Sequence, residues 1–155
     1  MQILTVLSAV GRIENKVAEH YQWLSNVFAD DPEASGFFFR MCMQEKSHAN
    51  LVSFAKKLAH RSPTDFSEIE VDLGVVDDLL DDLRTFRANN PNPSLAQALA
   101  FSMKIEGHDA ETIHRSLVIQ SNPEIANIIN NLAKADSEHF HMLENFAHQR
   151  AKAEM

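Results

Sequence analysis

The chain has 155 residues, of which 45% are hydrophobic, and it carries a formal net charge of −8 with one cysteine, Cys42. A chain of this length fits one domain with a buried core, and one cysteine excludes both an intrachain disulfide and a metal site built from several cysteines. The acidic balance and the scattered lysines and arginines argue against a nucleic-acid partner or an anionic membrane surface. We therefore expect a single domain over 1–155 and a reducing, cytoplasmic setting.

The first predicted element is a helix over about 3–29. The apolar start MQILTVLSAVG lacks the basic residues that open a signal peptide, and its pattern continues into charged amphipathic sequence. The sequence has no run of about 18 apolar residues, so no transmembrane helix is predicted.

Three further helices are predicted where a capping residue precedes a proline and a long apolar-periodic run follows. These starts are Asp31-Pro32, Asn92-Pro93 and Asn122-Pro123. The helices that follow cover about 32–59, 93–119 and 123–149.

The lengths of the connections predict the topology. Two or three residues join the first two long helices, and equally few join the last two, so each pair forms an antiparallel hairpin. Roughly thirty residues separate the hairpins, enough to cross a bundle from end to end, and VVDDLLDDLRTF within them predicts a short amphipathic helix. Two hairpins with one long crossover describe an all-α, ferritin-like four-helix bundle.

The last helix contains two overlapping carboxylate–imidazole pairs in ADSEHFHML, and their facing separates them. Asp136 and His139 lie in the apolar stripe that passes through Leu132. Glu138 and His141 are turned about 120° and 180° away from that stripe. The first pair is therefore predicted to face the bundle interior and the second pair to face water.

The same test finds acids on the inward faces of the other long helices. They are Glu14 in the first helix, Glu45 with His48 in QEKSH, and Glu106 in the third helix. Glu45, Glu106 and Asp136 each lie 13 residues after the proline that opens their helix, near its midpoint. Six residues on four faces are therefore predicted to meet at one depth.

Burying four carboxylates is costly without compensating positive charge. Two divalent cations balance them, and the two histidines can bind as neutral imidazoles. This ligand set suits iron, with manganese as the alternative, and it is the set described for di-iron bundles. The competing interpretation pairs the core acids with arginine, lysine or water, but no arginine or lysine lies near the midpoint of these stripes.

Other residues leave two readings open. Asp109, one turn after Glu106, is either an additional ligand or a carboxylate at the edge of the stripe. Tyr21 either hydrogen-bonds a ligand or is an ordinary core tyrosine. Cys42 is expected to be a buried, inert thiol. The remaining histidines are expected on the surface: His20, His60, His108, His114, His141 and His148.

Four segments together resemble the rubrerythrin-related branch of the ferritin-like di-iron superfamily over nearly the whole chain. They are Glu14 with Tyr21, QEKSHANL, SLAQALAFSMKIEGHDAE and LAKADSEHFHML. The resemblance implies a four-helix bundle, a di-iron centre, and homodimers or larger homo-oligomers. The chain departs from the family by lacking the four-cysteine rubredoxin domain, and by having Asp136 where the family usually shows glutamate. The family's extra carboxylate in the third helix could correspond to Asp109, one methylene short.

The six-residue constellation leads to the hypothesis of an oxidoreductase that reduces peroxide or dioxygen at a carboxylate-bridged centre of two iron ions. Glu45 with His48 and Asp136 with His139 would each hold one iron, and Glu14 and Glu106 would be terminal or bridging ligands. An electron donor outside the chain must then reset the centre. Iron handling, as a ferroxidase or store, and a non-enzymatic bundle stabilised by metal remain alternatives.

Overall fold

The computed structural model describes residues 2–61, 72–107 and 123–153, and the described residues form helices without any strand. The five helices within these ranges are α1 (Ile3–Val27), α2 (Pro32–Arg61), α3 (Gly74–Asn89), α4 (Leu95–Glu106) and α6 (Pro123–Ala153). None of them has both the length and the apolar character that crossing a membrane requires.

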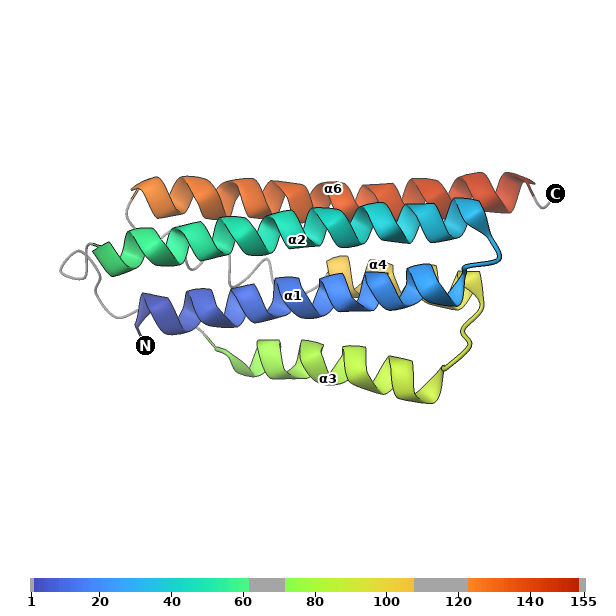
Figure 1. The fold of residues 1–155 in the computed structure, drawn as a ribbon, viewed down its shortest axis with the longest axis horizontal. Coiled ribbons are helices and arrows are strands. Elements are labelled where there is room, and N and C mark those ends of the chain that lie inside the picture. The colour runs from blue at the N-terminus through green and yellow to red at the C-terminus, as the bar shows by residue number, and fades with distance from the viewer. Residues whose placement is uncertain (1, 62–71, 108–122, 154–155) are drawn as a thin grey trace.

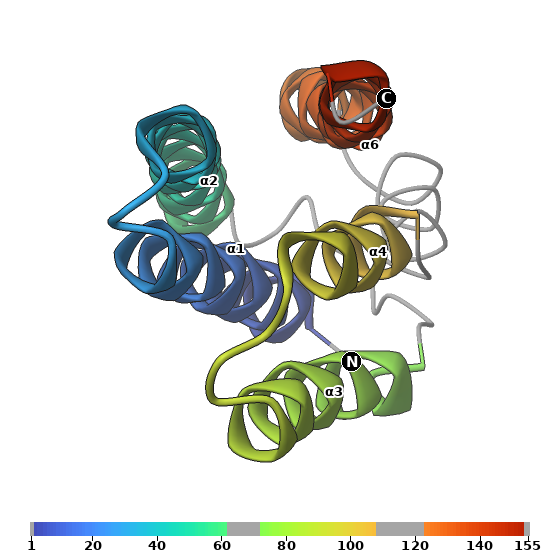
Figure 2. The ribbon, with the colours of Figure 1, turned by 90° about the vertical axis from the view of Figure 1, so that its right-hand side faces the viewer.

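The chain direction alternates in a way that brings four helices around one interior (Figure 1). α1 and α2 form an antiparallel hairpin, α3 returns along the outside of α1, and α4 and α6 again run in opposite directions. Figure 2 shows α1, α2, α4 and α6 around the interior, with α3 outside them. The short helix predicted within VVDDLLDDLRTF is confirmed as part of α3.

Local capping explains where the helices begin. Asp31 opens α2 as predicted, because its Oδ1 accepts the Ala34 backbone N–H at 3.1 Å. The predicted start of the third long helix at Pro93 is wrong, since α4 begins at Leu95 behind Ser94. Ser94 and Gln97 form a capping box that satisfies two backbone N–H donors, which outweighs the Asn-Pro signal upstream. The predicted continuation of that helix to residue 119 lies outside the described residues.

The core occupies the space between α1, α2, α4 and α6, and apolar residues of α3 extend it on the far side of α1. The largest side chains that are completely buried are Tyr21, Phe38, Leu7, Leu24, Met41, Ile125, Ile129, Leu132 and Leu143. Burying each large apolar side chain stabilises the fold by about 1.5–3 kcal/mol. These lines of buried residues fix the rotation of each helix about its axis, and so decide which polar residues point inward.

Candidate metal centre

Six ionisable side chains come together inside the bundle, at the level where the sequence places them. Glu14, Glu45, His48 and His139 are buried, with 3%, 1%, 7% and 2% of their surface exposed. One ligand atom from each of Glu45, His48, Asp136 and His139 lies within 4.8 Å of all the others. Glu14 and Glu106 flank this group, as the distances below show.

The imidazole of His48 faces carboxylates from three helices. Its Nδ1 lies 3.5 Å from Glu14 Oε2, 3.5 Å from Glu45 Oε2 and 3.7 Å from Asp136 Oδ1. Within the described part of the chain this buried nitrogen has no hydrogen-bond partner. A buried polar atom without a hydrogen bond is costly, and an additional group between these four residues would relieve that cost.

The spacing around His48 matches that of ligands around a small divalent ion. Ligand atoms lie about 2.0–2.2 Å from such an ion, so two of them at a tetrahedral angle are about 3.4 Å apart. The three distances from His48 Nδ1 are close to that separation and longer than those of ordinary hydrogen bonds. The residues present therefore fit a metal ion in both chemistry and spacing.

Glu45 is shared between the two histidines. Its Oε2 faces His48, while its Oε1 lies 2.7 Å from Nδ1 of His139. The two imidazole rings stack with their centroids 4.9 Å apart. His139 Nδ1 also faces Glu106 Oε1 at 3.6 Å. Each histidine thus has its own flanking glutamate, and Glu45 lies between the two halves of the site.

Two further side chains hold these groups in place. Tyr21 donates its hydroxyl hydrogen to Glu106 Oε1 at 2.6 Å, which is the hydrogen bond that one reading of the sequence proposed. Gln44 Oε1 lies 2.6 Å from Nε2 of His139. An acceptor at Nε2 keeps the hydrogen on that nitrogen and turns Nδ1 toward the acids. Sequence reasoning missed Gln44, although it directly precedes Glu45 in QEKSH.

Burial and mutual repulsion make two of the acids, Glu14 and Asp136, hold protons. Burial, reinforced by Glu45, raises the pKa of Glu14 to about 8. Burial, with the nearby Glu14, Glu45 and Glu106, raises the pKa of Asp136 to about 9. Burial also raises the pKa of Tyr21 well above its usual range, and the Glu106 carboxylate adds to this, so Tyr21 stays a donor.

The histidines respond in the opposite sense to burial. Burial alone would lower the pKa of His48, but Glu14 and Glu45 raise it to about 10. The pKa of His139 also rises to about 10, because Glu106 and Glu45 outweigh the effect of burial. At neutral pH the site therefore holds four such protons, on Glu14, Asp136, His48 and His139. They occupy the region in which bound metal ions would supply positive charge.

A cavity of about 20 Å³ adjoins the acids. It is lined by Glu14, Glu45, Glu106 and Asp136 together with apolar residues, among them Leu79 from α3. A space of this size holds about one water molecule. The crossover helix α3 therefore contributes to the wall that separates the acids from solvent.

The predicted facing of the two overlapping pairs on the last helix is confirmed. His139 is buried and Asp136 keeps 18% of its side chain exposed, whereas Glu138 and His141 are exposed. Cys42 is buried, as expected. Asp109, His108 and His114 lie outside the described residues. That the six residues bind metal remains a prediction, which their proximity supports.

The prediction that His20 lies on the surface is wrong. Only 5% of His20 is exposed, and its Nε2 lies 3.0 Å from Ser102 Oγ of α4. Phe86 of α3 packs edge-on against its ring. The sequence did not indicate which face of the bundle the crossover helix covers, and α3 and α4 enclose this residue.

Comparisons of the chain with protein-family models, with curated proteins and with solved structures find no match. Over the described residues, the structure establishes a helical fold with a Glu45, His48, Asp136 and His139 group in its interior that could hold metal.

Proposed function

We propose that this chain is a ferritin-like, rubrerythrin-related protein that binds two iron ions, with manganese as the alternative, among its buried acids and histidines. The helix directions support the bundle, since α1 and α6 run one way and α2 and α4 the other, with α3 crossing between the hairpins. The observation that carries the metal proposal is the position of His48 Nδ1. Within the described residues it is buried without a hydrogen bond, and carboxylates from three helices lie 3.5–3.7 Å from it.

The two halves of the site would each hold one ion. Glu14 and His48 form one half, Glu106 and His139 the other, and Glu45 offers one oxygen to each. Asp136 is one turn from His139 in sequence, yet its Oδ1 lies 3.7 Å from His48. One of its oxygens lies within 4.8 Å of a ligand atom of each histidine, so Asp136 would be available as a ligand in either half of the site.

We further propose that the site reduces peroxide or dioxygen with electrons from an external donor. Two ferrous ions, when bound, would supply the electrons and the Lewis acidity that this reduction needs. The small cavity beside the acids supports an oxidant no larger than these molecules and argues against an organic substrate. Tyr21 keeps its proton and holds Glu106, while Gln44 holds the hydrogen of His139 at Nε2.

The overlapping pairs on α6 offer a matched test. We expect anaerobic titration to load two Fe(II) ions per wild-type chain, and the reduced, loaded protein to consume peroxide faster than free Fe(II). The affinity of His139→Ala for Fe(II) should fall by about tenfold or more, so that at least one ion is lost. The variant should also lose the rapid consumption of peroxide. His141→Ala, an imidazole removed from the exposed side of the same helix, should behave as wild type.

The outcomes separate the alternatives. Loading that depends on His139 without any gain in peroxide or dioxygen consumption would remove the oxidoreductase proposal and leave a metal that only stabilises the bundle. Uptake of many ions per chain would favour iron handling. Equal loading of wild type and His139→Ala would refute the metal site itself.

Homodimers or larger assemblies are also a proposal. Among the described residues, the exposed large apolar side chains are Phe39, Met43, Leu51 and Phe54, all on α2. A second copy packed against this helix would remove them from water. Sedimentation equilibrium tests this, and a protein that stays monomeric at high concentration would refute it.

A further inference from the structure

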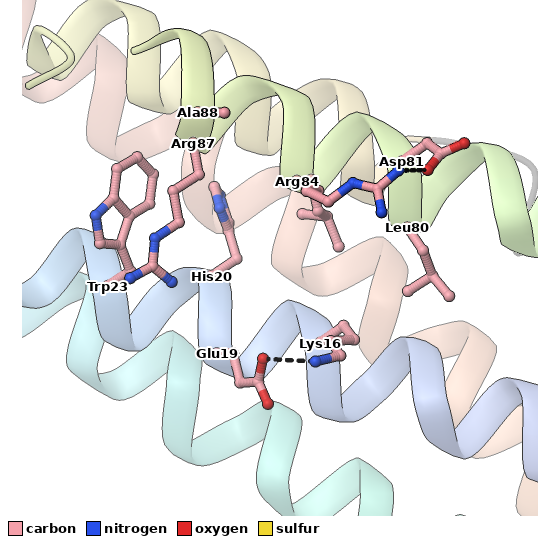
Figure 3. A pocket seen from close by; sticks show the side chains of 10 residues that line it. Lys16, Glu19, His20, Trp23, Leu80, Asp81, Arg84, Arg87 and Ala88 are labelled. Carbon is pink, nitrogen blue, oxygen red and sulfur yellow. Dashed lines mark hydrogen bonds and ion pairs between the residues drawn. The ribbon is translucent and has the colours of Figure 1, made fainter. Parts of the chain in front are cut away.

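A second hollow lies between α1 and α3, away from the buried acids (Figure 3). Its volume is about 530 Å³, within the range of roughly 300–1,000 Å³ typical of small-molecule sites. Lys16, His20 and Trp23 line it from α1, and Arg84 and Arg87 line it from α3. We call this hollow the α1–α3 pocket.

Within the part of the chain that the structure describes, one cation of the α1–α3 pocket has no acidic partner. Lys16 pairs with Glu19 at 3.1 Å, and Arg84 pairs with Asp81. Arg87 has no carboxylate within ion-pair distance among the described residues. Its guanidinium instead lies over the indole of Trp23, 5.2 Å from the ring centroid. An adjoining hollow shares Trp23 and Arg87 and adds Lys46, so this face carries excess positive charge on a chain of net charge −8.

The wall behind Trp23 and Arg87 is built from packed rings. Trp23 packs edge-on against Phe86 with centroids 6.2 Å apart, and Phe86 stacks on Phe101 at 4.0 Å. The His20–Ser102 hydrogen bond ties the wall to α4. Burial, together with the charge of Arg87, lowers the pKa of His20 to about 3, so the imidazole is neutral and Arg87 is the cation beside it. The aromatic surface is thus held in place before any ligand arrives.

We propose that the α1–α3 pocket binds a planar aromatic anion, with its ring against Trp23 and its acid group on the guanidinium of Arg87. A guanidinium stacked on a ring keeps its N–H donors at its edge, where they match a carboxylate or phosphate in pairs. The indole face and the apolar stems of the pocket accept a flat ring system. This binding site uses none of the candidate metal ligands and does not depend on the proposed function.

Trp23 provides a direct readout because it is the only tryptophan of the chain. The full-length protein is titrated with two matched pairs of probes, flavin mononucleotide with riboflavin and 2-naphthoate with 2-naphthamide. Each pair differs in the acid group, and the two anions distinguish a phosphate from a carboxylate. Inorganic phosphate alone serves as the third arm. Binding is followed by Trp23 fluorescence, corrected for probe absorption, and by calorimetry.

We expect saturable binding of at least one of the two anionic probes, about tenfold or more tighter than its uncharged partner, and no saturable binding of inorganic phosphate. Arg87→Ala should weaken that binding by about tenfold, and Arg87→Lys, which keeps the charge but not the planar fork, should weaken it by less. Arg61→Ala removes an exposed arginine at the end of α2 and should leave binding unchanged. Circular dichroism establishes that each variant is folded.

Three results would overturn the proposal. They are no saturable binding of either anionic probe, equal affinity for a charged probe and its uncharged partner, and unchanged binding in both folded Arg87 variants.

Discussion

At the residue scale, the candidate centre depends on which nitrogen of His139 faces the acids. Gln44 Oε1 lies 2.6 Å from Nε2, and Glu45 Oε1 lies 2.7 Å from Nδ1. These consecutive residues of α2 therefore contact opposite sides of the ring. An amide oxygen can only accept, so Gln44 directs the hydrogen to Nε2 and leaves Nδ1 for a metal ion.

Replacing Gln44 by leucine should therefore weaken metal binding without removing a ligand. We expect Gln44→Leu to lower Mn(II) affinity by about tenfold, because His139 loses the acceptor that fixes its orientation. Mn(II) binding is measured by paramagnetic resonance of the free ion. Nitrogen NMR of the imidazole in Zn(II)-loaded protein should show a changed hydrogen bond at Nε2. Gln149→Leu, at an exposed position of α6, is the control. An equal loss of Mn(II) affinity in both variants would contradict the role of Gln44.

Helical facing could predict the six clustered residues but not Gln44. Successive residues of a helix are rotated by about 100° around its axis. The sequence alone therefore distinguishes Asp136, which faces inward, from Glu138, which faces water. Gln44 lies one such step from Glu45 and reaches His139 only because its side chain is long. Its partner is 95 residues away in the chain, so no local pattern marks it.

At the element scale, α2 begins where one aspartate serves two partners. Asp31 Oδ1 accepts the Ala34 N–H, and Arg150 near the end of α6 donates to both carboxylate oxygens, at 3.2 and 2.6 Å. The start of α2 is thereby fastened to the last turns of α6. The Ala34 N–H and the Arg150 guanidinium hold the pKa of Asp31 below its usual range.

Asp31→Ala should lower the free energy of unfolding by about 1–2 kcal/mol, the typical contribution of an N-cap. Asp31→Asn keeps an accepting oxygen and should lose less. Because the pKa of Asp31 is lowered in the folded protein, its contribution is present above the unfolded value near 3.8 and is lost as the pH falls through the lower folded value. Urea unfolding at several pH values measures this contribution. A difference in unfolding free energy between wild type and Asp31→Asn that grows on acidification would contradict the prediction.

The elements differ in how much the sequence predicted. Asp31-Pro32 and the apolar periodicity were enough for α2, and the amphipathic stretch within the crossover was enough for α3. These sequence patterns could not show where α3 packs, because an amphipathic helix can bury its apolar face against any groove of the bundle. Its contact with α1 buried His20 and formed the α1–α3 pocket.

At the scale of the whole molecule, the buried cluster couples stability to pH. The pKa values of Glu14 and Asp136 rise from 4.5 and 3.8 to about 8 and about 9, and those of His48 and His139 rise from 6.5 to about 10. A raised folded pKa means that the contribution to stability is complete below the unfolded value and is lost as pH rises through the folded one. These four shifts therefore act in the same direction, whereas the lowered pKa of Glu45 acts in the opposite one.

Metal-free protein should accordingly become less stable as the pH rises from about 6 to 9. Glu14→Gln, which cannot ionise, should flatten this decline. Metal binding displaces the four protons, so the stabilisation by Mn(II) should grow over the same range. Thermal unfolding with and without Mn(II) measures both trends, and a metal-free protein that gains stability toward pH 9 would contradict the arrangement of charges described here.

The sequence predicted the helical bundle and the depth of the acids well, because both follow from periodicity and from the spacing between capping signals. The distances within the site could not be predicted in the same way. Which oxygen of Glu45 faces which histidine depends on side-chain rotamers and on the packing of α2 against α6, and these are set by contacts between distant parts of the chain.

The shared position of Glu45 has a consequence for folding kinetics. Glu45 and His139 are 94 residues apart, and Tyr21 and Glu106 are 85 apart, whereas α1 and α2 are neighbours in the chain. The local hairpin can form before the long loop closes, so the ligands would meet only late, after the folding transition state.

A metal ion should then slow unfolding and leave the rate of refolding unchanged. Stopped-flow unfolding and refolding with and without Mn(II) would show this, and faster refolding with metal would mean that the two hairpins dock early.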